Sequence, residues 1–237
     1  MRKLRKSIIA CCVAVGFAFA AAVSLCVRAL YTPRTAAAVD GGIKIVLDAG
    51  HGGIDGGVTG QRTGVKESDV NLQITFALKK ALEENGFSVI LTRKTKEGLY
   101  DTTARGFKKR DMQKRKEIIE RESPALILSL HQNFYASQSQ RGGQVFYGNY
   151  HPKSRVLATL LQTALNGLYA KENVKARKEH YGEYFMLQCY YAPSVIVECG
   201  FLSNPQDEEL LIDERWQKEF ADTIAKGVVT YFIEQTA

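Results

Sequence analysis

The sequence predicts an α/β fold: a single domain with a twisted, mostly parallel sheet of about six strands flanked by helices. Two observations carry this prediction. Short apolar runs rich in Val, Ile and Leu alternate with longer segments in which apolar residues recur at helical spacing. No linker, repeat or low-complexity tract interrupts residues 41–237. These residues are therefore expected to form one domain, preceded by an N-terminal segment, residues 1–40.

The expected elements alternate along the chain. The first helix has apolar residues at Val70, Ile74 and Leu78, and Asn85-Gly86 stops it. The second helix is basic, and Ser123-Pro124 ends it. The remaining assignments follow from the same two periodicities. In chain order, we expect strand 43–47, helix 70–82, strand 87–91, helix 102–121, strands 125–130 and 144–147, helix 154–169, strands 184–187 and 194–197, and helix 216–233.

Residues 1–40 predict a membrane anchor or a signal segment. Four basic residues precede an uncharged apolar run over residues 8–27. As a helix this run would be about 30 Å long, which is enough to cross a bilayer. Basic residues before the run favour a cytoplasmic N-terminus and export of the rest. Small residues at 35–38 leave cleavage open, although an uncleaved anchor is favoured. We expect an extracytoplasmic protein that is either membrane-anchored or secreted.

The net charge of +7 comes mainly from that segment. Residues 1–40 hold six of the 32 basic residues and one of the 25 acidic ones, which leaves 26 basic and 24 acidic residues, a net charge of +2, in residues 41–237. This near balance excludes nucleic acid as a partner. The basic segment 105–121 is interpreted as a solvated helix face, with attraction to an anionic polymer as the alternative.

Cysteine usage excludes a disulfide framework. Three of the five cysteines lie in the apolar run, so only Cys189 and Cys199 remain in the domain. Pairing of these two after export stays open.

Three expected strand ends carry a reactive residue. His51 follows the first strand within the glycine-rich stretch "GHGGIDGG", His131 follows "LILSL", and Glu198 follows "SVIV". In parallel sheets the carboxyl ends of the strands meet at one edge, where function gathers. The glycines indicate that something comes close to this backbone. A phosphate site is the weaker explanation, because the stretch has neither the Walker lysine nor Rossmann spacing.

Two histidines and a carboxylate at one edge suit a hydrolytic zinc site, which needs three protein ligands and an open position. Glu67 could reach the edge across the glycine-rich loop. Glu198, fixed at a strand end, suits a general base better than a third ligand. Each residue also has a structural explanation: the histidines can be strand-end packing residues, and Glu67 can complement a helix N-terminus.

Four segments, "LDAGHGGIDGG", "KESDVNL", "SLHQN" and "VECGFLSNPQDEELL", together resemble the zinc-dependent N-acetylmuramoyl-L-alanine amidases of bacterial cell walls. The resemblance implies Zn²⁺ held by His51, Glu67 and His131, with Glu198 as the catalytic carboxylate. It also implies a role for Asn133 in binding substrate or, alternatively, in orienting the ligand loop. It implies hydrolysis of the amide between the lactyl group of muramic acid and the L-alanine of the stem peptide in peptidoglycan. A short chain with one N-terminal anchor looks most like the germination-specific, spore-cortex type. An accessory or activator protein is a further possible partner.

Two residues near His131 depart from the family pattern. Gln132 and Phe134 stand where small residues are usual in this family, and their bulk suggests a narrower cleft. An exported zinc peptidase of the cell wall and a non-catalytic peptidoglycan-binding regulator are the alternatives. A cysteine hydrolase using Cys199 is disfavoured, because neighbours in a strand point to opposite faces and Glu198 is expected to face the cleft.

Overall fold

The structure is a computed structural model, and it describes residues 42–189 and 191–236. The expected N-terminal anchor, residues 1–40, lies outside the described residues, so it stays a prediction. Within the described part, no helix combines the length and apolar character needed to span a bilayer.

Strands and helices alternate as the sequence predicts. In chain order they are β1 (Lys44–Ala49), α2 (Glu67–Glu84), β2 (Ser88–Leu91), α3 (Phe107–Glu122), β3 (Leu126–Asn133), β4 (Gln144–Tyr147), α4 (Ser154–Ala170), β5 (His180–Tyr181), the 3₁₀ turn η1 (Phe185–Leu187), β6 (Ser194–Phe201), α5 (Pro205–Ile212) and α6 (Glu214–Thr236). They form a six-stranded sheet in the order β2-β1-β3-β6-β4-β5. Strands β2, β1, β3 and β6 are parallel, and β4 runs antiparallel to β6. The predicted fold class is confirmed.

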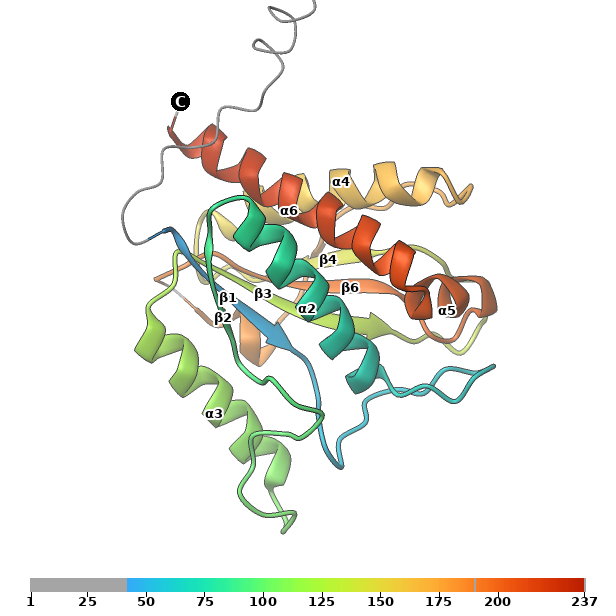
Figure 1. Ribbon diagram of the computed structural model, residues 1–237, viewed down its shortest axis with the longest axis horizontal. Coiled ribbons are helices and arrows are strands. Elements are labelled where there is room, and N and C mark those ends of the chain that lie inside the picture. Colours follow the sequence, from blue (N-terminus) through green and yellow to red (C-terminus); the bar gives the residue numbers. More distant parts are fainter. Residues whose placement is uncertain (1–41, 190, 237) are drawn as a thin grey trace, which may run out of the picture. The chain divides into compact units, whose positions relative to one another are not determined.

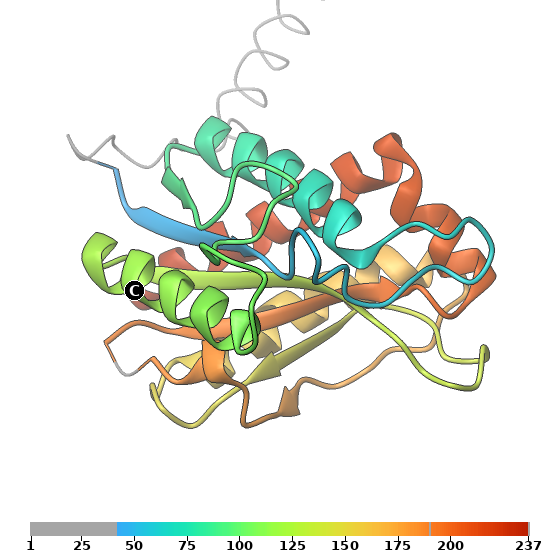
Figure 2. The same cartoon turned by 90° about the horizontal axis from the view of Figure 1, so that it is seen from below.

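Helices cover both faces of the sheet. Ile45 and Leu47 of β1 pack into a large apolar cluster with α2, α4 and α6, which lie together in Figure 1. Val46, between them, faces the other way and shares a smaller cluster with Ile119 of α3 and Met186 of η1. Figure 2 shows α2 and α3 on opposite sides of β1. Because both faces are covered, the central strands are continuous apolar runs.

Three sequence assignments were wrong. The expected strand 184–187 is a 3₁₀ turn in which the consecutive Met186 and Leu187 are both buried, and His180–Tyr181 pairs with β4 instead. Helix α3 begins at Phe107, five residues later than expected, because Gly106 is in the left-handed conformation, with φ 86°. Helix α5 was not expected, although Asn204 caps its first turn and a proline follows at the first helical position.

Candidate metal centre

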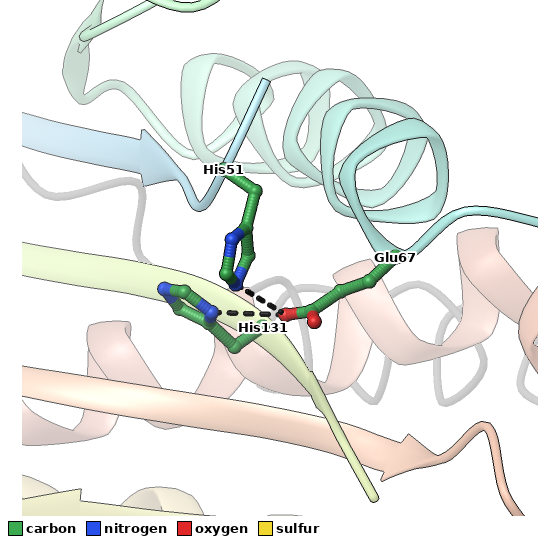
Figure 3. A group of neighbouring side chains, drawn as sticks. All are labelled: His51, Glu67 and His131. Atoms are coloured by element: carbon green, nitrogen blue, oxygen red, sulfur yellow. Dashed lines mark hydrogen bonds and ion pairs between the residues drawn. The ribbon is translucent and has the colours of Figure 1, made fainter. Parts of the chain in front are cut away.

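His51, Glu67 and His131 converge at the carboxyl edge of the sheet (Figure 3). Glu67 Oε1 lies 3.3 Å from His51 Nε2 and 3.0 Å from His131 Nδ1. One ligand atom from each residue lies within 4.8 Å of the other two. The rings of the two histidines are edge to face, with centroids 5.0 Å apart. Three side chains that are far apart in sequence thus present their donor atoms to one point.

The sheet and one helix terminus place these three residues. β1 and β3 are adjacent and parallel, so the residues that follow them share an edge. His51 comes two residues after β1, in the left-handed conformation with φ 61°, and His131 lies within β3. Glu67 is the first residue of α2, where the helix dipole favours a negative charge.

Glu67 is 2% exposed, and both of its carboxylate oxygens accept hydrogen bonds. Its Oε2 accepts the backbone N–H of Val58, and its Oε1 accepts that of Gln132. Burial alone would raise the pKa of Glu67, but hydrogen bonds from His131 and His51 outweigh it and lower the pKa well below its usual range. The carboxylate is therefore ionised, as a metal ligand must be.

His51 is held from its other ring nitrogen by Asp55. His51 Nδ1 lies 3.1 Å from Asp55 Oδ2, and Lys108 Nζ lies 3.1 Å from Asp55 Oδ1. Burial would lower the pKa of His51, but the interactions with Glu67 and Asp55 raise it above its ordinary value. A carboxylate at Nδ1 orients the ring and directs Nε2 to the cluster, the usual support of a metal-ligating histidine.

At two positions a glycine is needed because another side chain packs directly against its α-carbon. A β-carbon at Gly50 would lie 2.2 Å from Cε1 of the His131 ring, and one at Gly57 would lie 2.4 Å from Glu67 Oε2. Real β-carbons do not come this near to other atoms, so any side chain at either position displaces a member of the cluster. The sequence analysis expected a group to come close to this glycine-rich backbone, and at Gly50 and Gly57 the groups that do so are the side chains of His131 and Glu67.

Glu198 lies opposite His131 in the pairing of β3 with β6. Its Oε2 is buried and accepts no hydrogen bond from the described residues. Burial raises the pKa of Glu198 to about 7, opposed by His131 and supported by the negative charge of Glu67. A carboxyl group with a pKa near neutrality can both accept and return a proton.

A cleft of about 380 Å³ opens in front of these groups. His51, His131 and Glu198 line it together with Asp55 and Lys108. Aromatic side chains before and at the start of α3 and in the η1 region complete the walls: Tyr100, Phe107, Tyr184 and Phe185. The cleft therefore combines a polar, reactive end with an apolar lining, as ligand sites commonly do.

Two neighbours of His131 have other roles. Asn133 Oδ1 accepts the N–H of Phe134, so its predicted contact with substrate stays a prediction. The Gln132 side chain is buried, and its Nε2 donates to Asn71 Oδ1 on α2. The expectation that Gln132 narrows the cleft was wrong, because its bulk lies within the protein.

Cys189 and Cys199, the two cysteines within the described residues, are free and buried. Cys199 belongs to the cluster beneath α4 and α6, and Cys189 to the cluster on the opposite face, so they do not pair. Cys199 is fully buried, and burial raises the pKa of its thiol well above the usual range. A cysteine nucleophile needs an accessible thiolate, which excludes Cys199 from that role.

Sequence reasoning missed a buried charge network beneath the cluster. Arg115 of α3 contacts Asp48 and Asp111, each at 2.6 Å, so part of the segment interpreted as a solvated face is buried. Arg93 is also buried. A signal was present: Asp48 interrupts an apolar strand, and a buried carboxylate requires a partner. Arg115 lies four residues after Asp111 on the same helix.

The fold and the position of the cluster place the chain among α/β enzymes that gather their reactive groups at the carboxyl edge of a parallel sheet. Within this broad class, the chain can be assigned to one family. The N-acetylmuramoyl-L-alanine amidase family profile matches residues 45–230, and the chain belongs to this family. The family predicted from the four sequence segments is confirmed.

Individual relatives agree with this assignment. The chain is 34% identical over 194 residues to the germination-specific N-acetylmuramoyl-L-alanine amidase of Bacillus subtilis, covering 81% of this chain and 80% of that protein. It is 30% identical over 193 residues to the probable cell wall amidase LytH of Staphylococcus aureus, of which it spans 59%.

A solved structure is also similar. The CwlD amidase from Clostridioides difficile, solved in complex with the GerS lipoprotein, superimposes with a TM-score of 0.74 at 35% identity, over 80% of this chain and 98% of that one.

Proposed function

We propose that this amidase hydrolyses the bond between the lactyl group of muramic acid and the L-alanine of the stem peptide, using Zn²⁺ held by His51, Glu67 and His131. The observation that carries the proposal is the convergence of three ligand atoms within 4.8 Å, beside the buried carboxylate of Glu198. The bond is the one that the family's name specifies.

The three residues fit zinc. Two imidazole nitrogens and one carboxylate oxygen are a ligand set of catalytic zinc sites, which leave a position open. Glu67 is ionised, and Asp55 supports His51 from behind, so the donor atoms are prepared for a cation. When bound, zinc supplies Lewis-acid activation of water and of the amide carbonyl.

Glu198 performs the proton transfers. Its Oε2 takes a proton from the attacking water as oxygen bonds to the lactyl carbonyl carbon. The same carboxyl then returns this proton to the nitrogen of L-alanine as the C–N bond breaks. Tyr184 and Phe185 line the cleft beside the reacting groups and offer apolar surface to the substrate.

The biological setting follows from the relatives. The germination-specific relative and the CwlD structure support action on spore-cortex peptidoglycan, outside the cytoplasm. The GerS complex supports an accessory lipoprotein as a partner. The apolar run in residues 8–27 supports attachment to the membrane, and Asn133 is proposed to contact substrate. A non-catalytic regulator is disfavoured, since all three ligands and Glu198 are present.

The test is product analysis with metal control. The purified chain is stripped of metal, reloaded with zinc and incubated with cortex and vegetative peptidoglycan, and the products are identified by mass spectrometry. We expect free stem peptides beginning with L-alanine, only with zinc. Glu198→Gln should keep zinc and lose activity by about 10²-fold or more. Cleavage within the stem peptide would instead identify a zinc peptidase, and absence of release despite bound zinc would indicate a required activator or a binding role.

A further inference from the structure

Helix α3 is attached to the sheet largely by charge. Among its 16 residues, only Asp111, Arg115 and Ile119 are buried. Met112, partly buried, packs against the same apolar cluster as Ile119, so the helix has little of the apolar stripe that a surface helix ordinarily buries. Arg115 is 1% exposed, and it reaches across to β1 and the loop after it. Burial of a guanidinium group costs free energy unless each of its N–H groups donates to an acceptor.

Besides the carboxylates of Asp48 and Asp111, the acceptors are the backbone carbonyls that lead to His51. Arg115 donates from Nη1 to the Ala49 carbonyl at 2.7 Å and from Nη2 to the His51 carbonyl at 2.6 Å. Arg93 donates from Nη2 to the Gly50 carbonyl at 3.0 Å and from Nε to that of Ala49 at 2.8 Å. Two buried guanidinium groups therefore hold three consecutive carbonyl groups.

The held residue is also a strained one. His51 adopts φ 61°, a left-handed conformation that is unfavourable for a residue with a β-carbon and persists only where the surroundings enforce it. The hydrogen bond from Arg115 fixes the His51 carbonyl toward α3, while the His51 ring points to Glu67. Rotation of this peptide toward an unstrained conformation would move the ring away from the cluster.

We propose that Arg115 is a positioning residue for the metal centre: its hydrogen bond to the His51 carbonyl keeps His51 in the left-handed conformation that directs Nε2 to the metal. The inference rests on the proposed zinc site. Asp48 and Asp111 fix the guanidinium from two sides, so that its Nη1 and Nη2 groups donate to the loop carbonyls. A lysine would preserve the charge but not the rigid fork that reaches several acceptors at once.

The test measures zinc affinity and apo-protein stability separately in the full chain. Zinc affinity is determined by competition with a chromophoric chelator, the ligand geometry by the visible spectrum of the Co²⁺ form, and stability by urea unfolding of the metal-free protein. The variants are Arg115→Lys and the double variant Asp48→Asn/Arg115→Met, which removes both charges of the buried pair. Arg121→Lys, on the exposed part of the same helix, is the matched control.

We expect Arg115→Lys to weaken zinc binding by about 10–100-fold, as loss of outer-shell support does, and to change the Co²⁺ spectrum. The double variant should show a similar loss of zinc affinity even if its metal-free form is as stable as the wild type. Arg121→Lys should leave zinc affinity, the Co²⁺ spectrum and stability unchanged. Wild-type affinity in Arg115→Lys, or recovery of affinity together with stability in the double variant, would overturn the inference alone. If the wild type itself binds no zinc, the proposed metal site fails, and this inference fails with it.

Discussion

The backbone of Gly50 lies against the imidazole ring of His131, so that a β-carbon at Gly50 would be 2.2 Å from ring atom Cε1. The Gly50 N–H also donates to the carbonyl of Leu130, at 3.0 Å. The chain leaving β1 and the end of β3 are thus joined at the point where each carries a histidine of the cluster. The absence of a side chain at Gly50 is what allows both rings to face Glu67.

Substitution of Gly50 by alanine should displace His131. The added methyl group overlaps the ring, and overpacking of this kind costs about 1–3 kcal/mol of unfolding free energy. We expect zinc affinity to fall by at least about tenfold, because a ligand moves. Chelator competition and urea unfolding measure the two effects. Gly167 lies on the exposed face of α4, where nothing is within 4 Å of a new methyl group, so Gly167→Ala should lower neither zinc affinity nor stability. Equal zinc affinity in the Gly50→Ala and Gly167→Ala variants would contradict the prediction.

Zinc should stabilise the folded protein through Glu67. At a free zinc concentration about 100 times the dissociation constant, binding to the native state adds about 2.7 kcal/mol, or roughly 5–10 °C in melting temperature for a domain of this size. Removal of zinc with a chelator should reverse the rise. Glu67→Gln removes the ionised ligand and should abolish most of the rise in melting temperature caused by zinc. Glu84→Gln, at the exposed end of the same helix, should leave that rise unchanged. Thermal unfolding with and without zinc measures the rise, and an undiminished rise in Glu67→Gln would show that zinc binds elsewhere.

Stability should depend on acid pH through Asp48. Burial alone would raise the pKa of Asp48, but the charge of Arg115 and hydrogen bonds from Ser129 and Thr92 lower it from 3.8 to about 2. A lowered folded-state pKa stabilises the protein above the unfolded-state pKa, and the contribution is lost as pH falls toward the folded value. Linkage gives roughly 2 kcal/mol at pH 7 and about half of it at pH 3.

The comparison that isolates this effect is urea unfolding of the wild type and Asp48→Asn at pH 7 and pH 3. The advantage of the wild type should shrink by about 1 kcal/mol between the two pH values. Asp222→Asn, which alters an exposed ion pair on α6, serves as the control and should have little effect at either pH. A constant difference between wild type and Asp48→Asn would mean that Asp48 does not titrate with a lowered pKa.

Cys199 should be dispensable for activity. Its side chain is fully buried in the cluster under α4 and α6, so Cys199→Ala leaves a small cavity and should lower the unfolding free energy by about 1 kcal/mol. Amidase activity of the zinc-loaded protein should be unchanged, as it should be in Cys189→Ala. A Cys199→Ala protein that kept its zinc and its fold but lost activity would return cysteine chemistry to consideration.

The sequence predicted the parts of the site that depend on local pattern. Apolar runs located β1, β3 and β6 to within a few residues, and a reactive residue at each strand end identified His51, His131 and Glu198. The turn at 184–187 was misread because its composition resembles a strand, and only the packing of Met186 against α3 distinguishes the two. The partners of Asp48 could not be deduced, since Arg115 lies 67 residues away.

By itself, the sequence determined the order of most strands and helices and which residues stand at the ends of β1, β3 and β6, because the periods of 2 and 3.6 residues are properties of neighbouring residues. Only the tertiary structure decided that Glu67 joins the two histidines while Glu198 stands beside them. That outcome depends on the loop between β1 and α2 folding back, where Glu67 accepts the N–H of Val58 and Glu208 of α5 accepts that of Thr63. Contacts between groups so far apart along the chain depend on the packing of the whole domain, which local patterns do not encode.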